Sequence, residues 1–391
     1  MFAVLSRCRK LAGVLVLLLS ALALSACETV TTGGGAPSQA SGPKVRVALL
    51  VPHGAASPQE QQLARDLENA ARLAVTDLKG VRIDLRVYGT AGQPGMAQEA
   101  ALKAVADGAR IIVGPLQAET ANAVAVAVAG KNVNVLAFSN NATIAGGNLF
   151  ILGQTFRNTA NRLASYSVRQ GKNRVMAVYS DNLAGQLGRQ AIEAAVSANG
   201  GTVAGSVGYA FSQQGVINAV AQIRGTARAN GADAIFLTAN AAGALPLLTQ
   251  MLPEAGLGPD TIQYIGLSRW DTPAQTLELP GVQNGWFALP DPQRALQFRN
   301  RFQAAFGNSP HAISGLAYDG IAAVGALARS GSRNVLTREA LTQPAGFQGV
   351  SGVFRLLPDG TNERGLAIAT IRDQTVVVID PAPRGFGGTG F

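Results

Sequence analysis

Two short loops carry the polar side chains best placed to bind a small molecule. The first covers residues 114–120 (GPLQAET), between the apolar run 111–113 and a helical pattern. Free backbone N–H groups at a helix start can hold a carboxylate or an amide oxygen, and Gln117 and Thr120 would add side-chain donors. The alternative is a strand-to-helix turn that uses proline and glycine only for its geometry.

The second loop, residues 139–143 (SNNAT), follows the apolar run 135–138. Its small polar residues, Asn141 and Thr143 among them, either cap and close a turn or present short donors to a cleft. Because ligands of open parallel sheets bind beyond the carboxyl ends of the strands, both loops are candidate binding elements.

Residues for catalysis and metal binding are scarce. The chain has two histidines, His53 and His311, and two cysteines. Two isolated histidines rarely form a metal centre. The sequence contains no G-x-S-x-G elbow and no P-loop, and the G-x-G-x-x-G of residues 385–390 has no helix after it. We therefore expect no enzymatic activity, no metal site and no cofactor.

Cys27 has the context of a modified residue. Arg7, Arg9 and Lys10 precede an apolar run over 11–24, which is the layout of a signal peptide. The run, about 14 residues, is shorter than the roughly 20 that span a bilayer. It ends in LSAC, which resembles the lipobox of bacterial lipoproteins. We predict a signal peptide over 1–26 and lipidation of Cys27, with palmitate among the acyl chains. An ordinary signal peptide that happens to contain a cysteine is the alternative.

The predicted mature chain begins with a tether and has a modest positive charge. Residues 27–43 would comprise the lipidated cysteine and a flexible, glycine-rich stretch. Loss of the three basic signal-peptide residues lowers the formal charge from +9 to +6. The basic residues are scattered and aromatic residues make up 6% of the chain, which argues against nucleic-acid binding. Attachment to a bacterial membrane would rest on the lipid alone. The residue after Cys27 is Glu28, whereas the usual inner-membrane retention signal has an aspartate there. This difference favours attachment to the outer membrane.

From residue 45 onward, strand and helix patterns alternate. Strands are expected at 45–51, 81–88, 109–113, 133–138, 174–179, 202–209, 234–237 and 262–265, with helical patterns between most of them. Further helices at 294–306 and 312–328 precede strands at 350–356, 366–372 and 375–379. Strands separated by such helices form parallel sheets covered on both faces, so the fold class is α/β.

Three segments carry a family resemblance. GARIIVGPLQAETANAVAVAVAGKNVNVLAFSNNAT, GKNRVMAVYSDNLAGQLG and SGLAYDGIAAVGALA, in this order, resemble type I periplasmic binding proteins such as the leucine/isoleucine/valine-binding proteins of ABC transporters. The resemblance implies two doubly wound parallel-sheet lobes with a hinge of three crossovers. By analogy, the first lobe comprises 44–155 plus 288–345 and the second 156–287 plus 346–391.

The resemblance also implies a ligand site between the lobes, and this chain departs from its pattern. The serine-bearing turn reads Leu116-Gln117-Ala118, whereas the small-small-threonine loop is kept as Asn141-Ala142-Thr143. Arg157-Asn158 stands where an aspartate takes the ligand ammonium, and the turn with a lid tyrosine reads DNLAG over 181–185. LSRWD over 267–271 replaces a late acidic residue. The candidate ligand residues are Gln117, Asn141, Thr143, Arg157, Asn182, Arg269 and Trp270.

These departures favour a small polar or anionic ligand over a simple α-amino acid, because an ammonium needs anionic or aromatic partners. For Arg157 the alternative is a solvated helix-start arginine, and for Trp270 a core position. Two functions stay open. One is an extracytoplasmic solute-binding lipoprotein that delivers its ligand to an ABC permease. The other resembles the penicillin-binding-protein activators, lipoproteins that regulate a peptidoglycan synthase through protein contacts.

Overall fold

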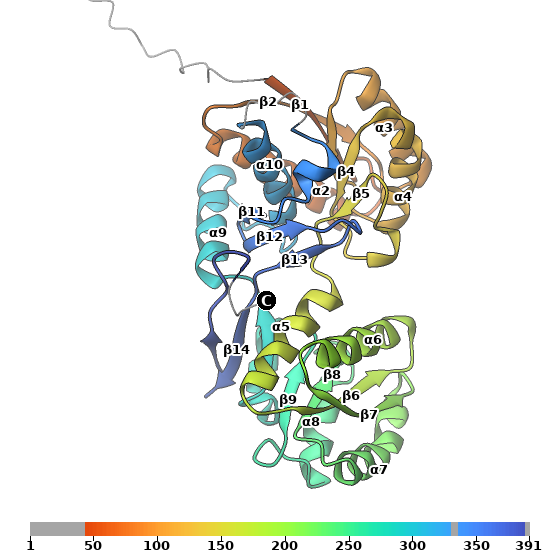
Figure 1. Ribbon diagram of the computed structural model, residues 1–391, viewed down its shortest axis with the longest axis vertical. Coiled ribbons are helices and arrows are strands. Elements are labelled where there is room, and N and C mark those ends of the chain that lie inside the picture. Colours follow the sequence, from red (N-terminus) through yellow and green to blue (C-terminus); the bar gives the residue numbers. More distant parts are fainter. Residues whose placement is uncertain (1–43, 330–334, 388–391) are drawn as a thin grey trace, which may run out of the picture. The chain divides into compact units, whose positions relative to one another are not determined.

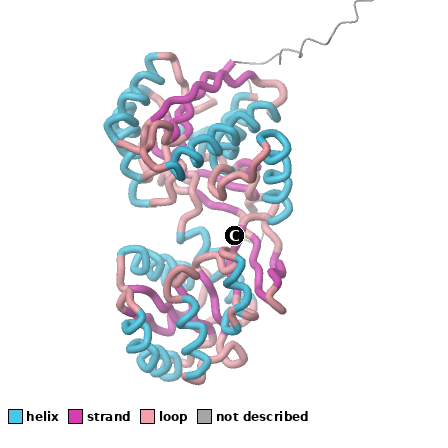
Figure 2. The backbone as a smooth tube through the Cα atoms, turned by 180° about the vertical axis from the view of Figure 1, so that it is seen from behind, coloured by secondary structure: helices cyan, strands magenta, loops and turns pink. Residues whose placement is uncertain are grey.

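The computed structural model describes residues 44–329 and 335–387, which belong to one compact unit of the chain (Figure 1). The predicted signal peptide, Cys27 and the tether lie outside the described residues. Helices flank the sheets on both faces, as the tube view also shows (Figure 2).

The first sheet has the strand order β2-β1-β3-β4-β5, and its strands are all parallel. The strands are β1 (Lys44–Val51), β2 (Arg82–Gly89), β3 (Ile111–Val113), β4 (Asn134–Ala137) and β5 (Leu149–Ile151). The connecting helices are α2 (Pro58–Asp77), α3 (Pro94–Ala106) and α4 (Ala118–Val128), with short 3-10 turns at η1 (Ala129–Lys131) and η2 (Ala142–Ile144). In the central strands, residues 47–51 of β1 and all of β3 are apolar and buried, because helices cover both faces of the sheet.

The start of helix α2, just after β1, is determined by its capping residues and its apolar periodicity. The Ser57 side chain accepts a hydrogen bond from the backbone N–H of Glu60, and Pro58 occupies the first turn, where its missing N–H costs nothing. Leu63 and Leu67 recur at a four-residue interval and are buried. Ser57 and Pro58 therefore fix the start of the helix just after the loop that follows β1, and the two leucines fix the face that packs on the sheet.

The second sheet has the order β15-β14-β10-β9-β8-β6-β7. Its strands are β6 (Arg174–Ser180), β7 (Thr202–Tyr209), β8 (Ala234–Leu237), β9 (Gln263–Gly266), β10 (Trp286–Leu289), β14 (Ala367–Arg372) and β15 (Thr375–Asp380). The helical segments are α5 (Phe156–Arg169), α6 (Leu183–Ala198), α7 (Gln213–Ala229), α8 (Leu245–Glu254), η3 (Ala274–Glu278) and η4 (Pro280–Val282). Strands β6 to β10 are parallel, whereas β14 and β15 join as antiparallel strands at one edge.

The late segments complete the core of the first sheet. They comprise α9 (Pro292–Phe306), α10 (Gly315–Ala328), α11 (Arg338–Leu341) and the small antiparallel sheet of β11 (Phe347–Gly349), β12 (Gly352–Leu356) and β13 (Asn362–Arg364). Phe302, Ile321, Phe347 and Phe354 share one hydrophobic cluster with Val47 of β1. We propose that 347–356 belongs to the first lobe and not to the second, because Phe347 and Phe354 lie in the hydrophobic cluster of the first sheet.

The chain passes between the two large sheets three times. It leaves the first sheet after β5, returns after β10 and enters the second sheet again at β14. The predicted fold class, two doubly wound parallel-sheet lobes with three crossovers, is confirmed.

Buried side-chain amides connect the first crossover, which follows β5, to the third crossover, which precedes β14. Asn362 Nδ2 donates to the carbonyl oxygens of Ile151 and Gly153, at 2.9 Å in each case. Asn158 Nδ2 in turn donates to the carbonyl oxygen of Asn362 at 2.7 Å. Each bond joins residues far apart in the chain. Together with the backbone bond from the N–H of Ile151 to the carbonyl oxygen of Gly360, at 2.9 Å, they hold the two crossing segments together.

A buried ion pair adds to this fastening. Arg364 Nη1 lies 3.1 Å from Asp319 Oδ2, and both side chains are nearly inaccessible, at 5% and 0% exposure. Arg364 Nε donates to the carbonyl oxygen of Leu152, while Asp319 Oδ1 accepts from the backbone N–H of Val350. Burial raises the pKa of the Asp319 carboxyl, and Arg364 and the Val350 N–H oppose that rise. The pair therefore ties α10 to both crossing segments.

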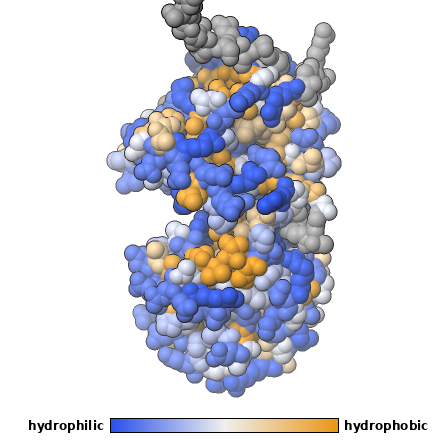
Figure 3. Space-filling model, turned by 90° about the vertical axis from the view of Figure 1, so that its left-hand side faces the viewer, coloured by the Kyte–Doolittle hydropathy of each residue, from blue (hydrophilic) through white to orange (hydrophobic). Residues whose placement is uncertain are grey.

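None of the helices within residues 44–329 and 335–387 is both long and apolar enough to cross a membrane. The face in Figure 3 is covered largely by polar side chains, with an apolar patch on its lower half.

Candidate functional site

A cavity of about 210 Å³ lies at the carboxyl ends of the parallel strands of the second sheet. Ser180 and Tyr209 end β6 and β7, Thr238 follows β8, and Leu267 and Ser268 follow β9. Because parallel strands all end at one edge, residues distant in sequence converge here. This is the edge at which open α/β sheets bind ligands.

The described residues that line this cavity carry no charge. They are Phe156, Ser180, Asn182, Ala184, Gly185, Tyr209, Phe211, Thr238, Ala239, Asn240, Gly243, Ala244, Leu267 and Ser268. Their polar groups are hydroxyls and amides, which can both donate and accept hydrogen bonds. This wall therefore suits an uncharged polar part of a ligand, and it offers no carboxylate to an ammonium.

Asn182 is held at the cavity by its role as a helix cap. Its Oδ1 accepts a hydrogen bond from the backbone N–H of Gly185 at 2.8 Å and another from the Ser180 hydroxyl at 3.1 Å. A Cβ at Gly185 would lie 2.0 Å from the Ser180 carbonyl oxygen, so this turn requires glycine. The amide Nδ2 of Asn182 is thus the group left to face a ligand.

Two of the aromatic rings at the cavity come from the end of β7 and the residues just after it, not from the 181–185 turn in which the family pattern has its lid tyrosine. The position of the lid tyrosine is Ala184 here, whereas Tyr209 at the end of β7 and the next-but-one residue Phe211 line the cavity. Burial raises the pKa of Tyr209 to about 12, despite a hydrogen bond with Ser180 that lowers it. Tyr209 is therefore neutral at physiological pH, which agrees with the uncharged wall.

The structure places the first-lobe candidates at the carboxyl edge of the first sheet, in two separate local pairs. Asn141 Oδ1 accepts from the backbone N–H and the hydroxyl of Thr143, at 3.0 and 2.8 Å. Gln117 Nε2 donates to Glu60 Oε1 at 3.1 Å. Glu60, in the first turn of α2, was not among the predicted residues, and it brings a carboxylate to this edge.

The two candidate arginines are both paired with carboxylates. Arg157 Nη1 lies 3.5 Å from Asp359 Oδ2, and Arg157 also bonds to Thr361. Arg269 Nε donates to Asp271 Oδ1 at 2.8 Å. Neither arginine lines the cavity at the strand ends, so an anionic ligand there would have to draw one of them away from its partner.

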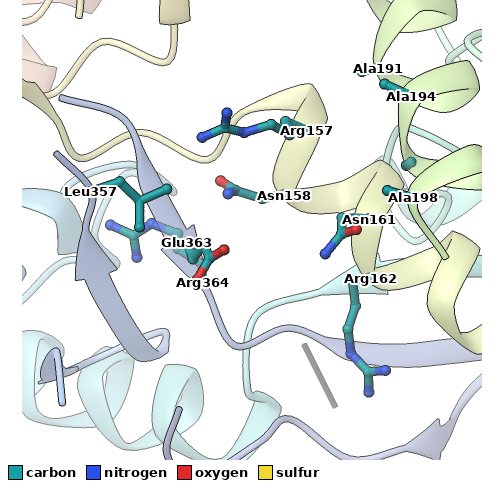
Figure 4. A pocket seen from close by; sticks show the side chains of 11 residues that line it. Arg157, Asn158, Asn161, Arg162, Ala191, Ala194, Ala198, Leu357, Glu363 and Arg364 are labelled. Carbon is teal, nitrogen blue, oxygen red and sulfur yellow. The ribbon is translucent and has the colours of Figure 1, made fainter. Parts of the chain in front are cut away.

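Arg157 lines a different cavity, of about 320 Å³, between α5, α6 and the segment around β13. In Figure 4, Arg157 and Asn158 extend toward Glu363 and Leu357, while the guanidinium of Arg162 points away from them. Arg157 is thus placed beside the third crossover.

Trp270 lies in the core of the second lobe. Its side chain has 0% exposure and stacks on Phe287, with ring centroids 6.4 Å apart. A Cβ on Gly266 or on Gly285 would lie within 2.4 Å of its ring, so the two glycines make the space that it fills. Trp270 presents no face to a ligand, and we omit it from the proposed site.

The structure has two lobes with parallel sheets, three crossings of the chain between them, and a polar cavity at the strand ends of the second sheet. These features define a class of two-lobed binding proteins. The family model described as periplasmic binding protein matches residues 44–375. The chain therefore belongs to the periplasmic binding protein family, whose compartment is the periplasm.

Solved structures show the same fold at low identity. A Rhodospirillum rubrum protein assigned to branched-chain amino acid ABC transport has 17% identity and a TM-score of 0.71, covering 86% of this chain and 100% of its own. A branched-chain amino acid ABC transporter ligand-binding protein from Burkholderia xenovorans has 20% identity and a TM-score of 0.66, covering 88% and 97%. A Rhodopseudomonas palustris solute-binding protein in complex with 3,4-dihydroxybenzoic acid has 16% identity and a TM-score of 0.57, covering 87% and 96%. No curated protein matches the chain.

Proposed function

We propose that this chain is a periplasmic solute-binding protein that delivers a small ligand to an ABC permease. The observation that carries the proposal is the cavity where β6, β7, β8 and β9 end, lined by hydroxyl, amide and aromatic groups. Related folds described as ABC-transporter binding proteins support it. A thermal-shift screen against amino acids, small peptides, sugars and muropeptides tests it, because a ligand at 100 times its Kd adds about 2.7 kcal/mol of stability.

The ligand we propose is not a simple α-amino acid. The wall of the second-lobe cavity has no carboxylate for an ammonium, and Arg157 stands where the family pattern expects the aspartate. One neighbour of this fold binds 3,4-dihydroxybenzoic acid, which has no ammonium group. In our proposal Gln117, Asn141 and Thr143 meet the ligand from the first lobe.

A second candidate function is regulation of a peptidoglycan synthase, as in the penicillin-binding-protein activators. It is favoured by the absence of the family's ligand aspartate and lid tyrosine from their expected positions. In that case the thermal-shift screen would find no solute, and loss-of-function variants would map to the outer faces of the lobes.

We further propose that the chain is a lipoprotein, held by acyl chains on Cys27 to a membrane, with the outer membrane favoured. The Cys27→Ala variant is then expected to remain an uncleaved or soluble precursor, because the thiol that receives the lipid is missing. Labelling cells with radioactive palmitate checks this, and the Cys8→Ala variant is the matched control. Equal labelling of wild type and Cys27→Ala would contradict the lipid anchor.

A further inference from the structure

A second cavity adjoins the polar one and differs from it in chemistry. It has a volume of about 350 Å³ and lies between the starts of α7 and α8. Val216, Pro246 and Leu247 form its apolar part, and Ser212 and Gln213 line it at the start of α7. The two cavities share four lining residues, namely Tyr209, Phe211, Gly243 and Ala244. A ligand in the polar cavity therefore has an apolar annex directly beside it.

Phe211 lies where the two cavities meet. Its loop follows β7, and a Cβ on Gly243, in the loop after β8, would lie 3.7 Å from Phe211 Cε2, so the ring spans from one loop to the other. Its side chain is nevertheless 68% exposed. A ring held on so little of its surface can turn at small cost, since few contacts fix its rotamer.

Exposed apolar side chains gather around the same opening. Leu183, the first residue of α6 and next to the cap Asn182, is 76% exposed, and Phe156 on the cavity wall is 40% exposed. Large apolar groups left in water next to a cavity mark a binding surface. Phe156 and Phe211 therefore add exposed aromatic surface to the polar wall of the cavity.

We propose that the ligand has an uncharged polar head, bound by the hydroxyls and amides at the ends of β6, β8 and β9, and an apolar tail that enters the annex. In this arrangement Phe211 covers the tail, and contact with Leu247 contributes to the affinity for it. This inference rests on the proposed solute-binding function and names the class of solute: an amphiphilic small molecule with an alkyl or aryl group.

A ligand series with one head and growing tails tests the inference on the purified full chain. Acetamide, butanamide, hexanamide and 3-phenylpropanamide share a primary amide, which pairs with hydroxyl and amide groups. We expect Kd, measured by ligand-observed NMR, to fall by about fourfold per methylene until the annex is filled. Leu247→Gln should weaken hexanamide and 3-phenylpropanamide at least tenfold and leave acetamide unchanged.

Two further variants sharpen the test. Phe211→Ala should weaken the long-tailed amides at least tenfold, whereas Leu296→Gln, at an exposed leucine of α9 outside both cavities, should change nothing. Kd values independent of tail length, yet raised by Thr238→Val in the polar cavity, would overturn the annex and leave the proposed function standing. Absence of binding by every amide, with folding intact, would overturn the inference and count against the function too.

Discussion

The Asp319→Ala variant is expected to lose about 3–5 kcal/mol of unfolding free energy, because removing one partner of a buried ion pair leaves the other charge buried and unpaired. Arg364 has 5% exposure and would keep the carbonyl oxygen of Leu152 and the ring of Phe354 as partners, neither of which carries a negative charge. The backbone N–H of Val350 would lose its acceptor as well. Urea denaturation followed by circular dichroism measures the loss, provided that the denaturant slope stays constant.

Two controls separate the loss of a buried pair from a general charge effect. Lys103→Ala removes one partner of an exposed pair with Asp107 on α3 and should cost less than about 1 kcal/mol. The double variant Asp319→Leu/Arg364→Met should recover part of the stability, since it leaves no unpaired charge. It still removes the partners of the Val350 N–H and the Leu152 carbonyl oxygen, so recovery should be incomplete. If Asp319→Ala cost no more than Lys103→Ala, the pair would not be holding the crossing segments.

Replacement of Trp270 by alanine is expected to cost about 3–5 kcal/mol, the range for truncating a buried large aromatic side chain. Trp270 has 0% exposure, and its ring packs directly against the backbone of Gly266 and Gly285. These glycines have no side chains that could move into the space left by the ring, so the variant should retain a cavity. Thermal unfolding followed by calorimetry detects the change as a lower Tm.

Variants of Trp270 also distinguish the two interpretations of this residue, a core position and a stacking surface for the ligand. Trp270→Phe should lose less stability than Trp270→Ala, and the folded fraction of either variant should bind the thermal-shift ligand with unchanged affinity. A Trp270→Ala protein of normal Tm that no longer binds ligand would place the ring in the site instead.

Most elements of the fold could be predicted, since their apolar periodicity is strong. The patterns at 174–179, 202–209 and 234–237 lie within one residue of β6, β7 and β8. β5, β10, β11 and β13, each three or four residues long, were missed. β3 and β8 are as short but were predicted, since a helical pattern lies on either side of each. β10 was hidden further by the irregular chain before it, where η3 and η4 replace a full helix.

The site was harder to predict, because it depends on which residues follow each strand. Asn182 was predicted from the resemblance of the 181–185 turn to the family pattern, and it lines the cavity. Tyr209, Thr238 and Ser268 were missed, although each stands at or just after a predicted strand of the second round. Searching the loops of that round as closely as those of the first would have found them.

Charge partners cannot be seen in a sequence pattern. Arg157 pairs with Asp359, which is distant in the chain, so its availability to a ligand depends on the third crossover. Arg269 pairs with Asp271, only two residues away. Ring burial is equally hidden, since the space for Trp270 is made by two glycines from different segments.

The central claim, a small ligand bound where the strands of the second sheet end, is tested most directly by isothermal titration calorimetry of cavity variants with the best thermal-shift ligand. We predict that Thr238→Val and Ser268→Ala each raise Kd at least tenfold, because each removes a hydroxyl that we propose bonds to a buried ligand group. The Ser268 hydroxyl donates to the carbonyl oxygen of Ala239, so it would accept a hydrogen bond from the ligand. Arg269→Ala should match wild type for an uncharged ligand and weaken an anionic one that draws Arg269 from Asp271. Equal Kd for wild type and both hydroxyl variants would contradict the account.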